Sequence, residues 1–124
     1  MPETSFTTLV SCDSVYLHDH APAFAASAAV YDNRSHIHII NPTTGDLDFA
    51  YKIRDNMKRI TKNELLTITY ESTDLSTLSQ EERRTYYACN RFLFADNLFD
   101  SNSGSLFITD IDSIFMDHIN EPNA

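Results

Sequence analysis

Two kinds of segment alternate strictly along this chain, and this alternation constrains the fold more than any other feature. Short apolar or β-branched runs bounded by polar residues are typical of strands. Four such runs occur, at residues 7–11, 35–40, 65–70 and 106–109. Segments of helical character separate them, which favours right-handed crossovers and a parallel sheet with helices on both faces. The sequence therefore predicts an α/β fold with three layers (α/β/α) and a mainly parallel sheet of about four strands, arranged in chain order.

The segments between these runs carry helix signals. Residues 20–30 are rich in alanine, and Pro22 would be tolerated only in the first turn of the helix that they predict. Beyond residue 46, apolar side chains recur at intervals of three and four residues, as in a helix with one buried side. These side chains are Phe49, Ile53, Met57 and Ile60. Ser79 and Glu82 fit a capping box, which predicts that a third helix begins there and continues to about residue 97.

Length and glycine content limit the kinds of nucleotide site that are available. The chain has 124 residues, enough for one hydrophobic core, so we assign residues 1–124 to a single domain with a polar tail at 120–124. It contains only two glycines, Gly45 and Gly104, whereas a dinucleotide fold or a P-loop needs several closely spaced ones. A nucleotide phosphate would have to be held by other means, and a metal ion is the obvious alternative.

Charge and cysteine content narrow the partners and the compartment. A net charge of −9 disfavours nucleic acid and anionic membrane surfaces and favours divalent cations. Cys12 and Cys89 lie in segments that we interpret as core, so both are expected to be free and buried. No signal segment opens the chain, and no run approaches the ~18 apolar residues of a membrane span. We therefore expect no nucleic acid partner, no membrane span and a cytoplasmic location.

Asp110 and Asp112 flank Ile111 directly after the last apolar run. With the two-residue period of a strand, both carboxylates would point to one side while Ile111 points into the core. Aspartate is depleted in strands, and two converging carboxylates suit Mg²⁺ or Mn²⁺. The alternative is a solvated pair at a strand-to-loop boundary, where aspartate also forms turns and caps helices.

The order of an aromatic helix, a short loop, an apolar strand and a D-x-D resembles the family-8 glycosyltransferases, which have the GT-A fold. The matching segments are residues 85–93 (TYYACNRFL) and 106–112 (LFITDID). Residues 9–16 (LVSCDSVY), followed by an alanine-rich stretch, are similar to the strand and turn with which that family contacts the base and ribose. Residues 36–41 resemble its second strand. The resemblance spans residues 6–119.

This resemblance assigns roles to five residues. It implies that Asp110 and Asp112 bind Mn²⁺ or Mg²⁺, and through the ion the diphosphate of a nucleotide sugar such as a UDP-hexose. It implies that Asp13 and Tyr16 contact the nucleoside and that Arg91 approaches the ribose or donor sugar. Arg91 is otherwise interpreted as a surface residue in a salt bridge.

The same resemblance implies an incomplete enzyme. Members of the family continue beyond the D-x-D with residues that contact the acceptor and supply a third metal ligand, whereas this chain stops soon after it. We expect hexosyl transfer only if another chain or segment completes the fold, with a homodimer or a partner protein covering the truncated edge. The main alternative is a truncated or retired glycosyltransferase fold that acts as a structural or protein-interaction module. An unrelated flavodoxin-like binding domain is a third.

Two histidine pairs stand outside these assignments. His18 and His20 flank Asp19, but a zinc site would need a third ligand from elsewhere, so we interpret them as solvated loop or helix-capping residues. His36 and His38 share one face of the strand predicted at 35–40, beneath a helix or at the rim of the sheet.

Overall fold

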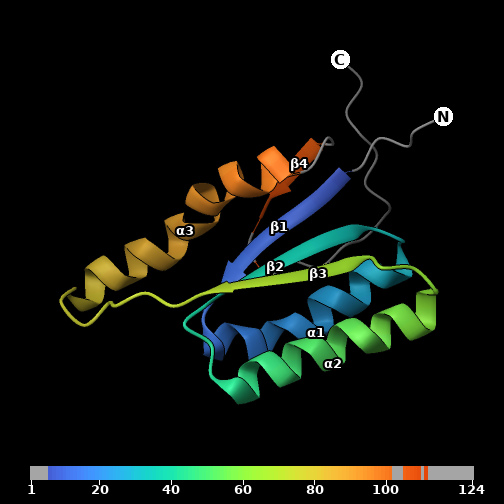
Figure 1. The fold of residues 1–124 in the computed structure, drawn as a ribbon, viewed down its shortest axis with the longest axis horizontal. Helices are drawn as coiled ribbons and strands as arrows, with labels where there is room; N and C mark the ends of the chain where they lie inside the picture. The colour runs from blue at the N-terminus through green and yellow to red at the C-terminus, as the bar shows by residue number, and fades with distance from the viewer. Residues whose placement is uncertain (1–5, 102–104, 110, 112–124) are drawn as a thin grey trace.

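The computed structural model describes residues 6–101, 105–109 and 111, and strands alternate with helices as predicted (Figure 1). The elements are β1 (Phe6–Cys12), α1 (Ser14–Val30), β2 (Arg34–Ile40), α2 (Thr44–Thr61), β3 (Leu66–Glu71), α3 (Gln80–Ser101) and β4 (Ser105–Ile108). The predicted α/β class is therefore confirmed. Three parallel strands of six or seven residues form the main part of the sheet, and the four-residue β4 lies along one side of it.

The strands lie in the order β3-β2-β1-β4, so our expectation of chain order was wrong. The chain moves outward from β1 through β2 to β3, and α3 then returns it to the other side of β1. With right-handed crossovers, a connection that moves to one side along the sheet places its helix on one face, and a connection that moves to the other side places its helix on the opposite face. The reversal therefore accounts for the position of α1 and α2 on one face and α3 on the other (Figure 1).

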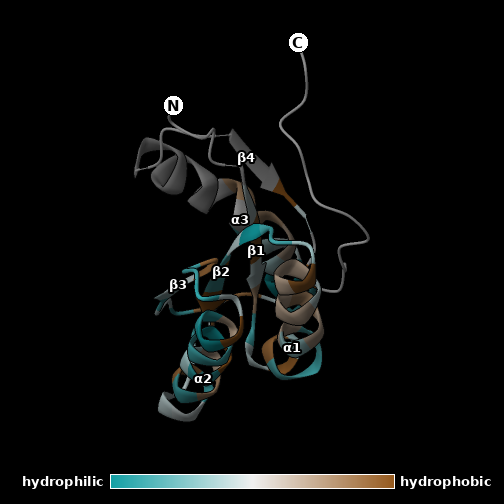
Figure 2. Ribbon diagram, turned by 90° about the vertical axis from the view of Figure 1, so that its right-hand side faces the viewer, coloured by the Kyte–Doolittle hydropathy of each residue, from teal (hydrophilic) through white to brown (hydrophobic). Residues whose placement is uncertain are grey.

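The hydrophobic core lies between the sheet and the α1–α2 pair. Alternate residues of the strands point to this face, including Val10 and Cys12 of β1 and Ile37 and Ile39 of β2. The buried cluster comprises Val10, Cys12, Leu17, Ala21, Phe24, Ala25, Ile37, Ile39, Ala50, Met57, Leu66 and Ile111. Figure 2 shows the two helices side by side, with α1 the more hydrophobic of the two. The opposite face of the sheet, toward α3, carries mainly polar side chains, together with the buried Leu9 and Ile40.

The first helix begins earlier than the alanine-rich segment predicts. The carboxylate of Asp13 accepts a hydrogen bond from the backbone N–H of Tyr16 and caps α1 at Ser14, so residues 14–20 are helical rather than a loop. Pro22 consequently lies inside the helix and not in its first turn, which corrects our prediction. The cap and the burial of Leu17 outweigh the hydrogen bond that a proline cannot donate.

The second helix follows its predicted stripe in part. Met57 is buried, but Ile60 is 71% exposed, so its place in the buried stripe was wrong. Thr43 and Asp46 form a capping box at the start of α2, each side chain accepting from the other's backbone N–H. Lys62 ends the helix with a φ of 64°, in the left-handed region.

The third helix is the longest described, and it begins where the sequence predicts. The Ser79–Glu82 capping box is present, with Ser79 N–H donating to Glu82 and Glu82 N–H donating to the Ser79 hydroxyl. Cys89 is exposed on this helix, so our expectation that it is buried was wrong. None of the helices in the described ranges is long and apolar enough to cross a membrane.

Candidate functional site

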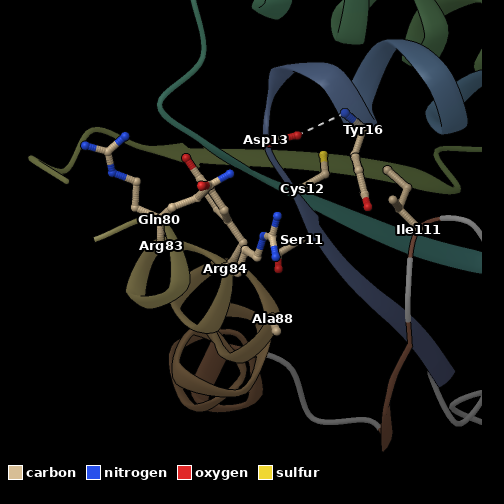
Figure 3. A pocket seen from close by; sticks show the side chains of 10 residues that line it. Ser11, Cys12, Asp13, Tyr16, Gln80, Arg83, Arg84, Ala88 and Ile111 are labelled. Carbon is tan, nitrogen blue, oxygen red and sulfur yellow. Dashed lines mark hydrogen bonds between the residues drawn. The ribbon is translucent and has the colours of Figure 1, made fainter. Parts of the chain in front are cut away.

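A pocket of about 650 Å³ lies where the strand order reverses (Figure 3). The end of β1 and the start of α1 line one side of it, the first turns of α3 line the other, and Ile111 borders it after β4. In open parallel sheets, ligands bind beyond the carboxyl ends of the strands at such a reversal. The location is therefore the one that this topology favours for a ligand.

The end of β1 forms the floor of the pocket. Ser11 is only 9% exposed, and its hydroxyl has no hydrogen-bond partner among the described residues. Cys12 is also buried, and burial, followed by the negative charges of Asp13 and Asp46, raises the pKa of its thiol to about 12. The thiol is therefore protonated and is not a nucleophile. The Ser11 hydroxyl is the one buried polar group on this floor that is left without a described partner.

The structure brings together two of the residues that the sequence predicted for the site. Asp13 and Tyr16 both line the pocket. One carboxylate oxygen of Asp13 accepts from the Tyr16 N–H at 2.9 Å and so is occupied by the helix cap. Tyr16 is 53% exposed, and its ring meets the ring of His20 edge-on at 5.4 Å. The second oxygen of Asp13 and the exposed half of Tyr16 remain accessible to a ligand.

The α3 side of the pocket carries positive charge that the sequence analysis did not find. Arg83 and Arg84 both line it, together with Gln80, Tyr87 and Ala88. The Nε of Arg83 donates to the backbone oxygen of Leu75 at 3.0 Å. Arg84 forms neither a hydrogen bond nor an ion pair with any described residue, although the chain carries a net charge of −9. Its guanidinium is therefore available to an anion.

One signal for these arginines was present in the sequence. Acidic side chains stabilise the positive end of a helix, and cations there are unfavourable. Two consecutive arginines follow directly after the Ser79–Glu82 capping box in a chain with only nine lysines and arginines. The pair comes just after the two glutamates of the first turn, Glu81 and Glu82, and forms a compact cationic group near the start of α3.

Three predicted site residues remain untested. Arg91 lies on α3 about two turns beyond Arg84, and its side chain is outside the described part of the chain. Asp110 and Asp112 also lie outside the described residues. Ile111 between them is 2% exposed and belongs to the core, which confirms the predicted direction of its side chain. The described residues contain no group of three His, Cys, Asp or Glu side chains that could hold a metal ion.

The H-D-H histidines are helical and have structural partners. Nε2 of His18 lies 2.8 Å from Oδ1 of Asp46, and the Ser14 hydroxyl donates to the same oxygen at 3.0 Å. Ser14 does not hydrogen-bond to His18, so the three side chains do not form a nucleophile–base relay. This cluster joins α1 to α2 rather than forming a catalytic or zinc site.

Comparison of the chain with protein-family models, with curated protein sequences and with solved structures finds no match.

Proposed function

We propose that the pocket binds the nucleoside diphosphate part of a nucleotide sugar, such as a UDP-hexose. The observation that carries the proposal is that Arg84 and the buried hydroxyl of Ser11 lie in the same pocket, and neither has a partner among the described residues. An arginine and a hydroxyl are typical donors to phosphate oxygens. The pocket volume falls within the usual range for small-molecule sites.

The two sides of the pocket suit different parts of such a ligand. Arg84 on α3 offers donors to phosphate, whereas Asp13 and Tyr16 at the start of α1 offer a carboxylate and an aromatic ring to a ribose and base. A carboxylate close to a diphosphate would repel it, so the phosphates belong nearer α3 and the nucleoside nearer α1. This assignment keeps the roles that the resemblance implies for Asp13 and Tyr16 and gives the cationic role to Arg84 in place of Arg91.

A divalent ion is part of the proposal through Asp110 and Asp112. Hard cations prefer carboxylate oxygens, and these two residues flank the pocket-lining Ile111 in the sequence. The described residues do not make a metal site on their own, so Mn²⁺ or Mg²⁺ rests on this pair. In glycosyl transfer the ion would neutralise the leaving diphosphate. This chain's own residues would bind and orient the donor, and hexosyl transfer stays conditional on an acceptor site.

Calorimetry with UDP, in the presence and absence of Mn²⁺, tests the proposal. We expect R84A to weaken UDP binding about tenfold or more, because a charged hydrogen bond contributes about 1.5–3 kcal/mol. R59A is the matched control, since Arg59 is exposed on α2 and its side chain donates to Asn56, away from the pocket. D110N and D112N should remove the Mn²⁺-dependent part of the affinity, whereas D48N on the exposed side of α2 should not.

Two results would contradict this assignment. Equal UDP affinities for R84A and R59A would remove Arg84 from the site. Absence of UDP binding by the wild-type chain, with or without Mn²⁺, would favour the alternative of a structural or protein-interaction module.

A further inference from the structure

A chain of hydrogen bonds crosses the sheet on the face that α3 covers. His36 of β2 lies between two threonines of β3, with Nδ1 at 2.6 Å from Thr67 Oγ1 and Nε2 at 2.8 Å from Thr69 Oγ1. His38 continues the chain, with Nδ1 at 2.8 Å from the same Thr69 oxygen and Nε2 at 3.0 Å from Oε1 of Glu71. The parallel register places these residues opposite one another on one face of the sheet.

The donors and acceptors of this chain can be assigned in only one way when both histidines are neutral. An ionised Glu71 only accepts, so His38 donates from Nε2 and its Nδ1 accepts the proton of the Thr69 hydroxyl. The Thr69 oxygen then accepts from Nε2 of His36, whose Nδ1 accepts from Thr67. Burial, and then the neighbouring His38, lower the pKa of His36 to about 4, which keeps His36 neutral. All four bonds therefore run in one direction and end on Glu71.

Glu71 connects this chain to α3. The Tyr86 hydroxyl donates to its Oε2 at 2.7 Å, and Asn90 Nδ2 donates to its Oε1 at 2.6 Å. Burial acts to raise the pKa of Glu71, but the hydrogen bonds from His38, Tyr86 and Asn90 leave it below its usual value. One carboxylate thus receives donors from β2 and from two successive turns of α3.

No described lysine or arginine pairs with Glu71. The titratable groups that face it are His38 from β2 and Tyr86 from α3, while Thr69 and Asn90 complete its surroundings. The neighbouring positions of β1 on this face, Leu9 and Ser11, do not titrate. Glu71 therefore holds α3 through hydrogen bonds from neutral donors. Such bonds depend more strongly on distance and angle than a solvent-exposed ion pair does.

The turns of α3 that Glu71 holds also carry the pocket wall. Tyr86 is adjacent to Tyr87 and two residues from Arg84, and both of these line the pocket. On the sheet, Ser11 of the pocket floor pairs in register with His38. The hydrogen-bond chain therefore lies directly beside the pocket and fixes the helix that supplies its cation.

We propose that Glu71 is a positioning residue for the pocket. It accepts the hydrogen-bond chain that begins at Thr67 and two further hydrogen bonds from α3, and it thereby determines where α3 places Arg84. The effect on ligand affinity rests on the proposed function, whereas the effect on α3 and on Arg84 does not. Glutamine at this position keeps the shape but replaces one acceptor oxygen by an NH₂ donor. At the Oε1 position that donor would face His38 and Asn90, both of which already donate, and at the Oε2 position it would require the Tyr86 hydroxyl to turn from donor to acceptor.

The test compares E71Q with E64Q, a matched change at a largely exposed glutamate that pairs with Lys58 at 2.8 Å. Amide hydrogen exchange in residues 83–90 should accelerate about tenfold or more in E71Q, because the opening free energy falls by the lost charged hydrogen bonds. Exchange in α1 and α2 should stay unchanged. The Nε–H resonance of Arg84 should shift in E71Q and not in E64Q, and UDP affinity with Mn²⁺ should fall about tenfold.

A second pair of variants covers the case in which E71Q fails to fold. Y86F removes one donor to Glu71, and Y70F makes the same change at an exposed tyrosine of β3. Y86F should show the same faster exchange in α3 and the same shift of the Arg84 resonance as E71Q, but to a smaller extent. Y70F should resemble the wild type. In the wild type, ¹⁵N spectra at neutral pH should show His36 as its Nε2–H tautomer.

The outcomes separate this inference from the proposed function. A wild-type chain that binds no UDP refutes the proposed function alone, since exchange and the Arg84 resonance still decide the role of Glu71. Unchanged α3 exchange and an unshifted Arg84 in both E71Q and Y86F would overturn the inference. The inference would also be overturned if the wild type binds UDP and E71Q shows faster α3 exchange but the same UDP affinity as the wild type. Glu71 would then stabilise α3 without positioning the pocket.

Discussion

Nε2 of His18 on α1 lies 2.8 Å from Oδ1 of Asp46 at the start of α2. Asp46 is only 4% exposed, and the same carboxylate accepts from the Ser14 hydroxyl and from the backbone N–H of Thr43. One buried carboxylate thus completes the capping box of α2 and binds two side chains of α1. Because every one of its bonds is made to a donor, its charge is essential to the junction.

Replacing Asp46 by asparagine should destabilise the fold by about 2–3 kcal/mol, since charged hydrogen bonds are lost and an NH₂ group faces donors. D48N is the matched control, because Asp48 is exposed on the same helix. Urea unfolding followed by circular dichroism measures the difference. Similar midpoints for the two variants would contradict the role assigned to this carboxylate.

The same group predicts an acid limit for the fold. The Thr43 backbone hydrogen bond lowers the pKa of Asp46 most, burial opposes it, and His18 and Ser14 lower it further, to about 2 from 3.8. A carboxylate that holds its proton less tightly in the native state stabilises the fold above the unfolded-state pKa. This contribution, about 2 kcal/mol, should be lost as the pH falls from about 4 through 2. D46N should show a shallower loss of stability over that range.

Local sequence signals predicted the elements well, but not the start of α1. Strand runs and the Ser79–Glu82 box act over a few residues, and the structure follows them. Residues 14–20 include several polar side chains and were therefore not predicted as helix. The partner of His18 is Asp46, 28 residues further along the chain, and a local stretch of sequence does not reveal that contact. The reversal of strand order was missed for a similar reason, since alternation of strands and helices does not encode the direction of travel along the sheet.

Position along a strand determines where two of the predicted residues lie. Asp13 and Tyr16 follow the end of β1, and the structure places both at the pocket. Which turn of α3 faces the pocket depends instead on how the helix lies across the sheet, and the bonds from Tyr86 and Asn90 to Glu71 fix that. The sequence therefore indicated an arginine on this helix but not Arg84.

His36 provides a second pH-dependent contribution to stability. Its native pKa of about 4 lies below the ordinary 6.5, so the unfolded chain takes up the proton first as the pH falls. Stability from the neutral, buried imidazole is therefore complete above about pH 6.5 and is lost progressively toward pH 4, by up to about 3 kcal/mol. Histidine Cε1–H resonances followed over this range should show a midpoint near 4 for His36. An ordinary midpoint near 6.5 for His36 would refute the burial of its neutral form.

The two cysteines should differ sharply in reactivity, because Cys89 is exposed and Cys12 is buried. Cys89 is exposed on α3, whereas Cys12 lies in the core at the end of β1 with its pKa raised to about 12. The thiolate is the reactive species, so Cys12 in the folded protein offers neither access nor charge to a disulfide reagent. Ellman's reagent at neutral pH should modify one thiol per chain in the native protein and both in denaturant. C89S should abolish the native reaction, and C12A should leave it intact. A native C89S protein that still reacts at the rate of an exposed thiol would show that the floor of the pocket opens, and would contradict the closed packing of Cys12 against α1.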